Sequence, residues 1–199
     1  MQEYDFARAA IDLALGRGGD QVVIKEGENI RYYGGKSQSV ERQTRVKARV
    51  KAHALRELVE AKECVLIMGH QNGDIDVLGA AIGIWRICQA IGTEAHIVFD
   101  NIPGSLTAFA DRFRGQAEYP DDLFVSGEQA RAMVDQDTML VVVDVNIPMR
   151  TECPELLGMV DTIVVLDHHR TKAEGIQNAV LSYVEPNMAA AVIEQLEGR

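Results

Sequence analysis

The chain has 199 residues, 47% of them hydrophobic and 25% charged, which is the composition of a soluble globular protein with a buried core. Thirty acidic residues against twenty basic ones give a net charge of −10, so a nucleic-acid duplex is not an expected partner. No apolar stretch approaches the ~20 residues of a membrane span, and the three cysteines lack metal-site spacing. We therefore expect a soluble, cytoplasmic chain with reduced thiols.

The first 62 residues predict two pieces of structure. A helix is expected over 5–15, and two strands over 21–25 and 30–33 are separated by a turn. One helix and one hairpin bury too little apolar surface to fold alone, so this piece is interpreted as the end of another domain. A single helix over 37–62 follows, with an apolar stripe and many basic residues on its other faces. We interpret it as a linker helix; a basic ridge near an anionic ligand is the alternative.

From residue 63 onward, strands and helices alternate. The expected strands span 64–68, 96–99, 139–143, 162–166 and 179–184. The expected helices span 77–91, 126–134 and 188–197, with a further short helix opened by Pro154 and an irregular stretch around 106–113. This alternation predicts an α/β fold with a doubly wound, mostly parallel sheet, which binds ligands at the carboxyl ends of its strands.

Three of the expected strands lead into acidic or imidazole side chains. These residues are His70, Asp74 and Asp76 after the first strand, Asp144 and Asn146 after the third, and Asp167, His168 and His169 after the fourth. An ionised carboxylate directly after five apolar residues is costly unless a partner or a metal compensates it. Because these strand ends should share one edge of the sheet, we expect oxygen and imidazole ligands for two divalent metals there. Gly69 and Gly73 are expected to give the first loop its backbone freedom.

Each segment taken alone also has a structural interpretation. A core histidine beside a helix-capping aspartate would explain the first loop, and Asn146 could cap the turn that follows Asp144. Other chemistries find no support in the sequence, which lacks both a G-x-S-x-G nucleophile elbow and a complete P-loop. The convergence of three such strand ends favours the metal site over the structural alternative.

These motifs resemble a known family. Gly69-His70 with Asp74-x-Asp76, Asp144 after three valines, and Asp167-His168-His169 resemble the first three motifs of the DHH-family phosphoesterases. The similarity is greatest to the GdpP/YybT type of cyclic-di-AMP phosphodiesterase, whose degenerate GGDEF domain ends in a segment similar to residues 9–35. The resemblance implies three parts: a GGDEF remnant over 1–36, a linker helix over 37–62, and a DHH domain over 63–199 that stops before the family's DHHA1 domain.

The resemblance also implies an activity and a set of site residues. It implies hydrolysis of cyclic di-AMP to linear pApA with two Mn²⁺ ions, Mg²⁺ or Fe²⁺ being alternatives, in a module tethered to the membrane by other segments. His70 and Asp74 would hold one ion, Asp76 and His168 the other, and Asp144 would bridge them. The predicted catalytic residues are Asp144, Asp167, His168 and His169, and the predicted substrate contacts are Asn146, His169 and Arg170. A homodimer is compatible with the sequence.

Two alternatives remain open at this stage. The first is a nano-RNase or exonuclease of the same superfamily, acting on short linear oligonucleotides. The second is a non-catalytic nucleotide-binding fragment, because a further metal ligand of the family would lie beyond Arg199. Two departures from the family pattern are Gly73, at a position usually held by proline, and Met188-Ala189-Ala190 in place of a hydroxyl-bearing segment.

Overall fold

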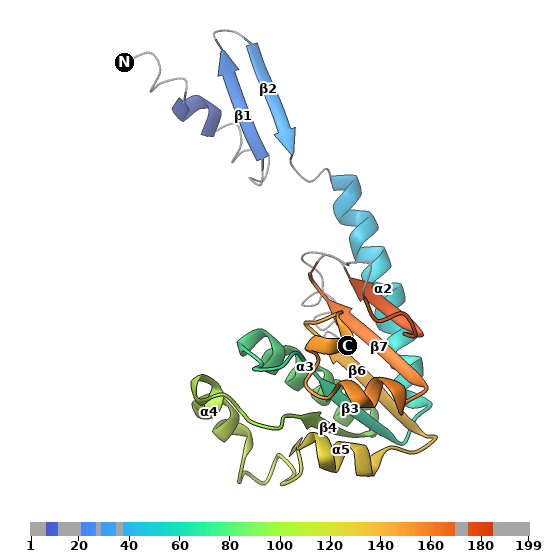
Figure 1. Cartoon of the computed structure of the whole chain (residues 1–199). Coiled ribbons are helices and arrows are strands. Elements are labelled where there is room, and N and C mark those ends of the chain that lie inside the picture. The colour runs from blue at the N-terminus through green and yellow to red at the C-terminus, as the bar shows by residue number, and fades with distance from the viewer. Residues whose placement is uncertain (1–6, 12–20, 27–28, 35–37, 170–174, 185–199) are drawn as a thin grey trace. The chain divides into compact units, whose positions relative to one another are not determined.

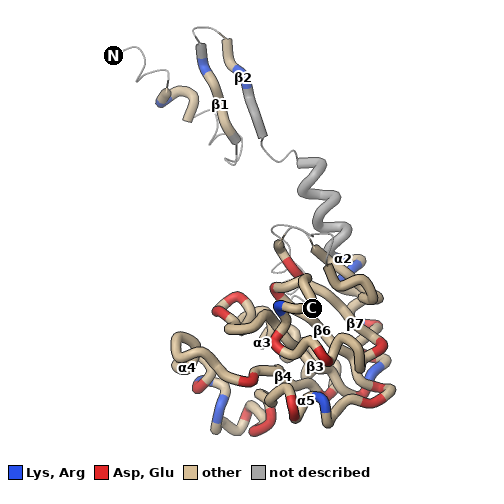
Figure 2. Tube along the Cα trace, viewed as in Figure 1, with Lys and Arg blue, Asp and Glu red and all other residues tan. Residues whose placement is uncertain are grey.

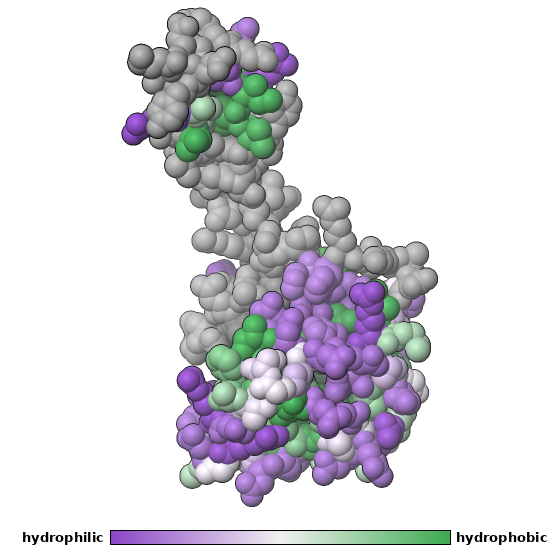
Figure 3. Space-filling view, turned by 60° about the vertical axis from the view of Figure 1, so that its left-hand side comes forward, coloured by the Kyte–Doolittle hydropathy of each residue, from purple (hydrophilic) through white to green (hydrophobic). Residues whose placement is uncertain are grey.

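The computed structural model describes residues 7–11, 21–26, 29–34, 38–169 and 175–184, and it separates into two compact units, residues 1–47 and 48–199 (Figure 1). In the first unit, β1 (Gln21–Glu26) and β2 (Asn29–Gly34) form the predicted antiparallel hairpin, in which Gln21 lies opposite Gly34. Val22, Ile24 and Ile30 are exposed on it, and hydrophobic side chains are visible on this unit in Figure 3. The described part of the predicted first helix, residues 7–11, is helical.

The second unit is an α/β domain built on one six-stranded sheet. Its strands are β3 (Cys64–Met68), β4 (Glu94–Val98), β5 (Phe124–Val125), β6 (Thr138–Val143), β7 (Thr162–Asp167) and β8 (Leu181–Val184). They lie in the order β5-β4-β3-β6-β7-β8, and every neighbouring pair is parallel. The predicted doubly wound parallel sheet is therefore confirmed.

Helices and 3₁₀ turns connect these strands. They are α2 (Gln38–Glu60), α3 (Ile75–Ile91), α4 (Gly104–Ala110), η1 (Asp111–Phe113), α5 (Gly127–Met133), η2 (Pro148–Arg150) and η3 (Pro154–Gly158). The stretch predicted to be irregular thus contains α4 and η1, and the short helix opened by Pro154 is a 3₁₀ turn. The two-residue strand β5 was not predicted, because two residues carry no periodicity. The predicted helix over 188–197 lies outside the described residues.

Both faces of the sheet are covered, which explains the unbroken apolar runs of its central strands. Successive side chains of a strand point to opposite faces, so Val65 and Ile67 pack on the face covered by α2 and α3, with Leu55 and Trp85. Leu66 and Met68 pack on the other face, which α5 and η3 cover. Most large apolar side chains of this unit are buried, although Ile75, Met149 and Val180 are exposed, and hydrophilic residues predominate on the face of this unit that Figure 3 shows.

The last turns of α2 belong to the core of the second unit. Leu55 and Val59 from the predicted apolar stripe are buried, whereas Val50 is 63% exposed. None of the described helices is both long and apolar enough to cross a membrane. Acidic positions are more numerous than basic ones along the trace of this unit, as Figure 2 shows.

The strand order creates a crevice at the carboxyl edge of the sheet. After β3 the chain continues to β4 on one side, and it later returns to place β6 on the other side of β3. The connections that leave β3 and β6 therefore run in opposite directions, and such a switch point is where doubly wound sheets bind ligands. The loops with the predicted metal ligands follow these two strands and β7.

Candidate functional site

The loop after β3 presents His70 with one ring nitrogen free to bind a metal. The Nδ1 atom lies 2.8 Å from the carbonyl oxygen of Gln71, which accepts its proton. The Nε2 atom then carries a lone pair and lies 3.7 Å from Oδ2 of Asp74 and 3.8 Å from Oδ2 of Asp144. A backbone carbonyl that fixes the tautomer in this way is a common feature of metal-binding histidines.

Asp74 has two roles, one structural and one facing the site. Its Oδ1 atom caps α3 by accepting hydrogen bonds from the backbone N–H groups of Asp76 at 3.0 Å and Val77 at 3.1 Å. Partial burial opposes ionisation, but these two hydrogen bonds from the backbone outweigh it and lower the pKa of Asp74. The carboxylate therefore stays charged, with Oδ2 directed toward His70. The capping interpretation and the ligand interpretation are compatible.

Gly69 and Gly73 are needed because neighbouring side chains leave no room for a Cβ atom at either position. Our prediction that they give the loop its backbone freedom was wrong. Of the described glycines, only Gly92 and Gly115 have a positive φ. A Cβ atom added to Gly69 would lie 2.2 Å from Cγ1 of Val77, and one added to Gly73 would lie 2.8 Å from the ring of Phe99. The left-handed conformation in the loop is taken by Asn72, with φ 54°.

Asp144 lies at the centre of the site. It is 8% exposed, and its Oδ1 atom lies 2.8 Å from Nδ1 of His168 while Oδ2 faces His70. Its φ of 57° is left-handed, a conformation that costs energy in a residue with a side chain and occurs often at functional sites. Burial raises the pKa of Asp144 against the opposing influence of His168 and His169. Such a carboxylate gains from any cation placed beside it.

Asp167 is buried and holds its neighbours in place. Its Oδ1 atom accepts hydrogen bonds from the backbone N–H of His169 at 3.1 Å and from Nδ1 of the same residue at 2.7 Å. Its Oδ2 atom accepts a hydrogen bond from Nδ2 of Asn146. The hydrogen bond to Asp167 raises the pKa of His169. Asp167 thus joins the loop after β6 to the loop after β7 through hydrogen bonds.

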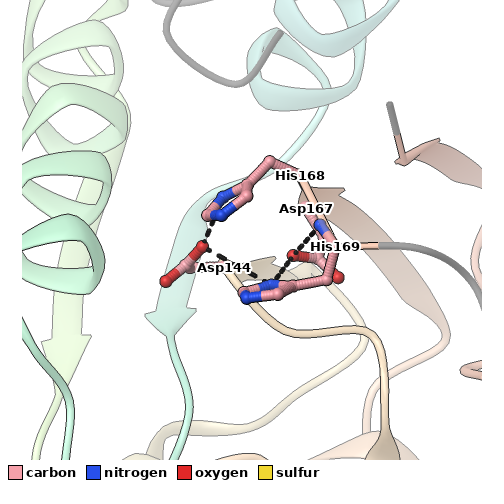
Figure 4. Close-up of side chains that lie close together, drawn as sticks. All are labelled: Asp144, Asp167, His168 and His169. Carbon is pink, nitrogen blue, oxygen red and sulfur yellow. Dashed lines mark hydrogen bonds and ion pairs between the residues drawn. The ribbon is translucent and has the colours of Figure 1, made fainter. Parts of the chain in front are cut away.

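Figure 4 shows the imidazole rings of His168 and His169 turned toward Asp144. The rings of His168 and His169 stack with their centroids 4.2 Å apart, and Nδ1 of His169 lies 3.9 Å from Oδ1 of Asp144. Asp144, Asp167, His168 and His169 therefore form one group of donor atoms within 4.8 Å of one another, and His70, Asp74 and Asp144 form a second. Asp144 belongs to both groups.

A pocket of about 590 Å³ contains both groups. Asp76 and Asn146 also line it, although Asp76 belongs to neither group of donor atoms. Arg170, the remaining predicted residue, lies outside the described residues. The pocket wall includes five residues that the sequence did not predict, Gln71, Asn72, Val145, Ile147 and Arg150, of which Arg150 at the end of η2 is the charged one. The sequence indicates Arg150 only by a basic residue that follows Asp144 within the same loop.

Residues 64–194 match the family model described as the DHH family, N-terminal domain. The chain belongs to the DHH family. This DHH chain is 45% identical over 184 residues to the cyclic-di-AMP phosphodiesterase GdpP of Geobacillus thermodenitrificans (strain NG80-2), covering 90% of the chain and 28% of that relative. It is 41% identical over 200 residues to GdpP of Bacillus subtilis (strain 168), covering 97% of the chain and 30% of that relative. The chain thus spans less than a third of these relatives.

A solved structure supports the fold of the DHH domain. An exopolyphosphatase-related protein from Bacteroides fragilis superposes with a TM-score of 0.59 at 14% identity, covering 76% of this chain and 44% of that one. At this identity the likeness concerns the fold alone. DHH phosphoesterases are metal-dependent, and the two groups of donor atoms around Asp144 offer carboxylate and imidazole ligands of the kind that divalent metals bind.

Proposed function

We propose that this chain is the catalytic module of a metal-dependent phosphodiesterase that hydrolyses cyclic di-AMP to linear pApA. The observation that carries the proposal is the position of Asp144, which faces His70 through one carboxylate oxygen and His168 through the other. The two relatives named cyclic-di-AMP phosphodiesterases, 45% and 41% identical, support the choice of substrate. A cyclic dinucleotide is also compatible with an acidic chain, provided that cations hold its phosphates.

The proposed ligands are divided between two ions. His70 and Asp74 would hold one Mn²⁺, Asp76 and His168 would hold the other, and Asp144 would be a ligand of both. The fit rests on the free Nε2 of His70, the free Oδ2 of Asp74 and the oxygen-and-imidazole donor set, which suits Mn²⁺ and also Mg²⁺ or Fe²⁺. When bound, a pair of divalent ions supplies Lewis acidity to the phosphate and lowers the pKa of water.

The remaining site residues are proposed to bind and orient the substrate. Asp167 holds the imidazole of His169 at the wall of the pocket and raises its pKa, which favours a protonated ring that donates to a phosphate oxygen. Asn146 donates a hydrogen bond to the same carboxylate and lines the pocket. Arg170 is proposed as a further substrate contact on the basis of its place next to the motif.

The direct test is product analysis with the purified protein. Incubated with cyclic di-AMP and Mn²⁺, it is expected to release pApA, which chromatography separates from the substrate, and EDTA is expected to abolish the reaction. A linear dinucleotide such as pGpG serves as the comparison substrate. Faster cleavage of the linear dinucleotide would favour the nano-RNase alternative, and binding without turnover of either substrate would favour the non-catalytic one.

The division of the chain also stands as a proposal. On the resemblance, residues 1–36 are the remnant of a degenerate GGDEF domain, residues 37–62 are a linker helix, and residues 63–199 are the DHH domain. For the whole protein, the same resemblance supports a tether to the membrane that leaves the module in the cytoplasm. A homodimer is likewise a proposal for the whole protein.

A further inference from the structure

We propose that Arg150 determines substrate specificity by binding the second phosphate of a cyclic dinucleotide, the one that is not cleaved. This inference rests on the proposed function, because it assigns a role to a residue on the wall of the same pocket. Arg150 ends the 3₁₀ turn η2, lines the pocket and is exposed. It belongs to neither group of donor atoms and is not one of the residues predicted from the motifs.

The backbone of Arg150 is fixed against the loop that carries His70. The carbonyl oxygen of Arg150 accepts a hydrogen bond of 2.8 Å from the N–H of Gln71, and the N–H of Glu152 donates to the carbonyl of Gly69 at 2.9 Å. Between them, Thr151 pairs with His70 in an antiparallel bridge. Residues 150–152 therefore run alongside residues 69–71, and the position of the Arg150 Cα follows that of His70.

Hydrogen bonds within the turn η2 also fix its conformation. The side-chain hydroxyl of Thr151, a residue with 0% exposure, donates to the carbonyl of Pro148 at 2.8 Å, and the N–H of Arg150 donates to the carbonyl of Ile147 at 3.0 Å. A long basic side chain on a rigid turn loses less freedom on binding than one on a loose loop. The structure thus fixes the backbone of this basic residue on the wall of the pocket that contains the proposed metal site.

The charges around the pocket explain why this cation matters. Four carboxylates line the pocket, those of Asp74, Asp76, Asp144 and Asp167, and Arg150 is the only lysine or arginine among its described lining residues. Within the part of the chain that the structure describes, no carboxylate lies within 4.0 Å of the Arg150 side chain, so no described acidic residue competes with a ligand for its guanidinium.

A cyclic dinucleotide carries two phosphodiesters on opposite sides of one ring. In the proposed function, two metal ions neutralise the reacting phosphate, whereas the other phosphate would face a carboxylate-rich pocket without a counter-charge. A guanidinium binds a phosphate through two parallel hydrogen bonds and keeps its charge at any working pH. Arg150 supplies such a group from a backbone position that is fixed on the wall of the pocket. A substrate with a single phosphodiester makes no use of it.

The test compares two substrates in three variants of the purified protein. The substrates are cyclic di-AMP, with two phosphodiesters, and bis(p-nitrophenyl) phosphate, with one. The variants are Arg150→Ala, Arg150→Lys and, as a matched control, Arg112→Ala, which removes an exposed arginine of η1 that does not line the pocket. The quantity measured is the ratio of kcat/KM for cyclic di-AMP to kcat/KM for the single diester, with Mn²⁺ saturating.

Arg150→Ala is expected to lower this ratio by roughly 10- to 100-fold, the usual effect of losing a hydrogen bond to a charged group, mainly through KM for cyclic di-AMP. Arg150→Lys is expected to recover part of the loss, because it keeps the charge but not the paired geometry. Arg112→Ala is expected to leave the ratio unchanged.

Three results would overturn the inference. Unchanged kcat/KM values for both substrates in Arg150→Ala would exclude a specific contact to the second phosphate, and an equal loss on both substrates would assign Arg150 a general role in the site. Either result would leave the proposed function intact as long as the wild-type protein cleaves cyclic di-AMP. Cleavage of the single diester alone by the wild type would contradict both the proposed substrate and the role of Arg150.

Discussion

Asp144→Asn is expected to lower Mn²⁺-dependent hydrolysis of cyclic di-AMP by roughly 10³-fold or more, because loss of a metal's contribution costs several kcal/mol in the transition state. Asp144 is the one residue that faces both His70 and His168, and an amide offers one neutral oxygen in place of two charged ones. The measurement is kcat/KM for pApA release, with metal affinity measured in parallel by calorimetry.

The substitution should not unfold the protein. Asparagine tolerates the left-handed conformation that Asp144 adopts, with φ 57°, better than most residues do. Burial raises the pKa of Asp144, so a neutral side chain of similar shape should leave the melting temperature unchanged or raise it. Asp161→Asn, at an exposed carboxylate outside the pocket, is the matched control and should keep full activity. An Asp144→Asn protein with more than about a tenth of wild-type activity would contradict the bridging role.

Gly69→Ala is expected to lower the free energy of unfolding by about 3 kcal/mol, since overpacking a filled core site costs of this order. The added Cβ would lie 2.2 Å from Cγ1 of Val77, which is fully buried at the start of α3. Relief of this clash must move α3 or the loop that carries His70, so activity should fall as well. Thermal unfolding should show a decrease of about 6–12 °C in Tm for a chain of this size.

Two further variants separate this clash from a general effect of replacing glycine. Gly79→Ala changes a glycine inside α3 with open space around the new Cβ, and it should stabilise the protein by about 0.5–1 kcal/mol. The double variant Gly69→Ala/Val77→Ala removes the atoms that clash and should be more stable than Gly69→Ala alone. Additive losses in the double variant would show that Val77 is not the cause.

The sequence predicted the fold and the place of the site because both depend on strong local patterns. Five of the six strands of the sheet are apolar runs long enough to recognise, whereas β5 has only two residues. The strand ends with Asp144 and Asp167 were expected at one edge, and the structure brings them together there. That expectation needed only the parallel arrangement of the strands, which the alternation of strands and helices indicates.

Details that depend on the packing of side chains, on the exact start of a helix or on contacts between distant segments could not be predicted. Glycine is needed at position 69 because the side chain of Val77 lies too close for a Cβ atom there, and this closeness results from the packing of α3 on the loop. Asp74 caps α3 while its other carboxylate oxygen faces the site, because α3 begins at Ile75. The sequence predicted that this helix begins at residue 77. Arg150 was missed because its place beside His70 results from hydrogen bonds between two segments about eighty residues apart in the sequence.

The measurement that tests the two-metal site most directly is anomalous diffraction at the manganese edge from crystals grown with Mn²⁺. We expect two peaks in the pocket roughly 4 Å apart, the spacing of paired metals that share a bridging carboxylate. One should lie beside Nε2 of His70 and Oδ2 of Asp74, the other beside Asp76 and His168, with Asp144 in contact with both. An empty pocket at saturating Mn²⁺, or a pair of ions that Asp144 does not contact, would contradict the account.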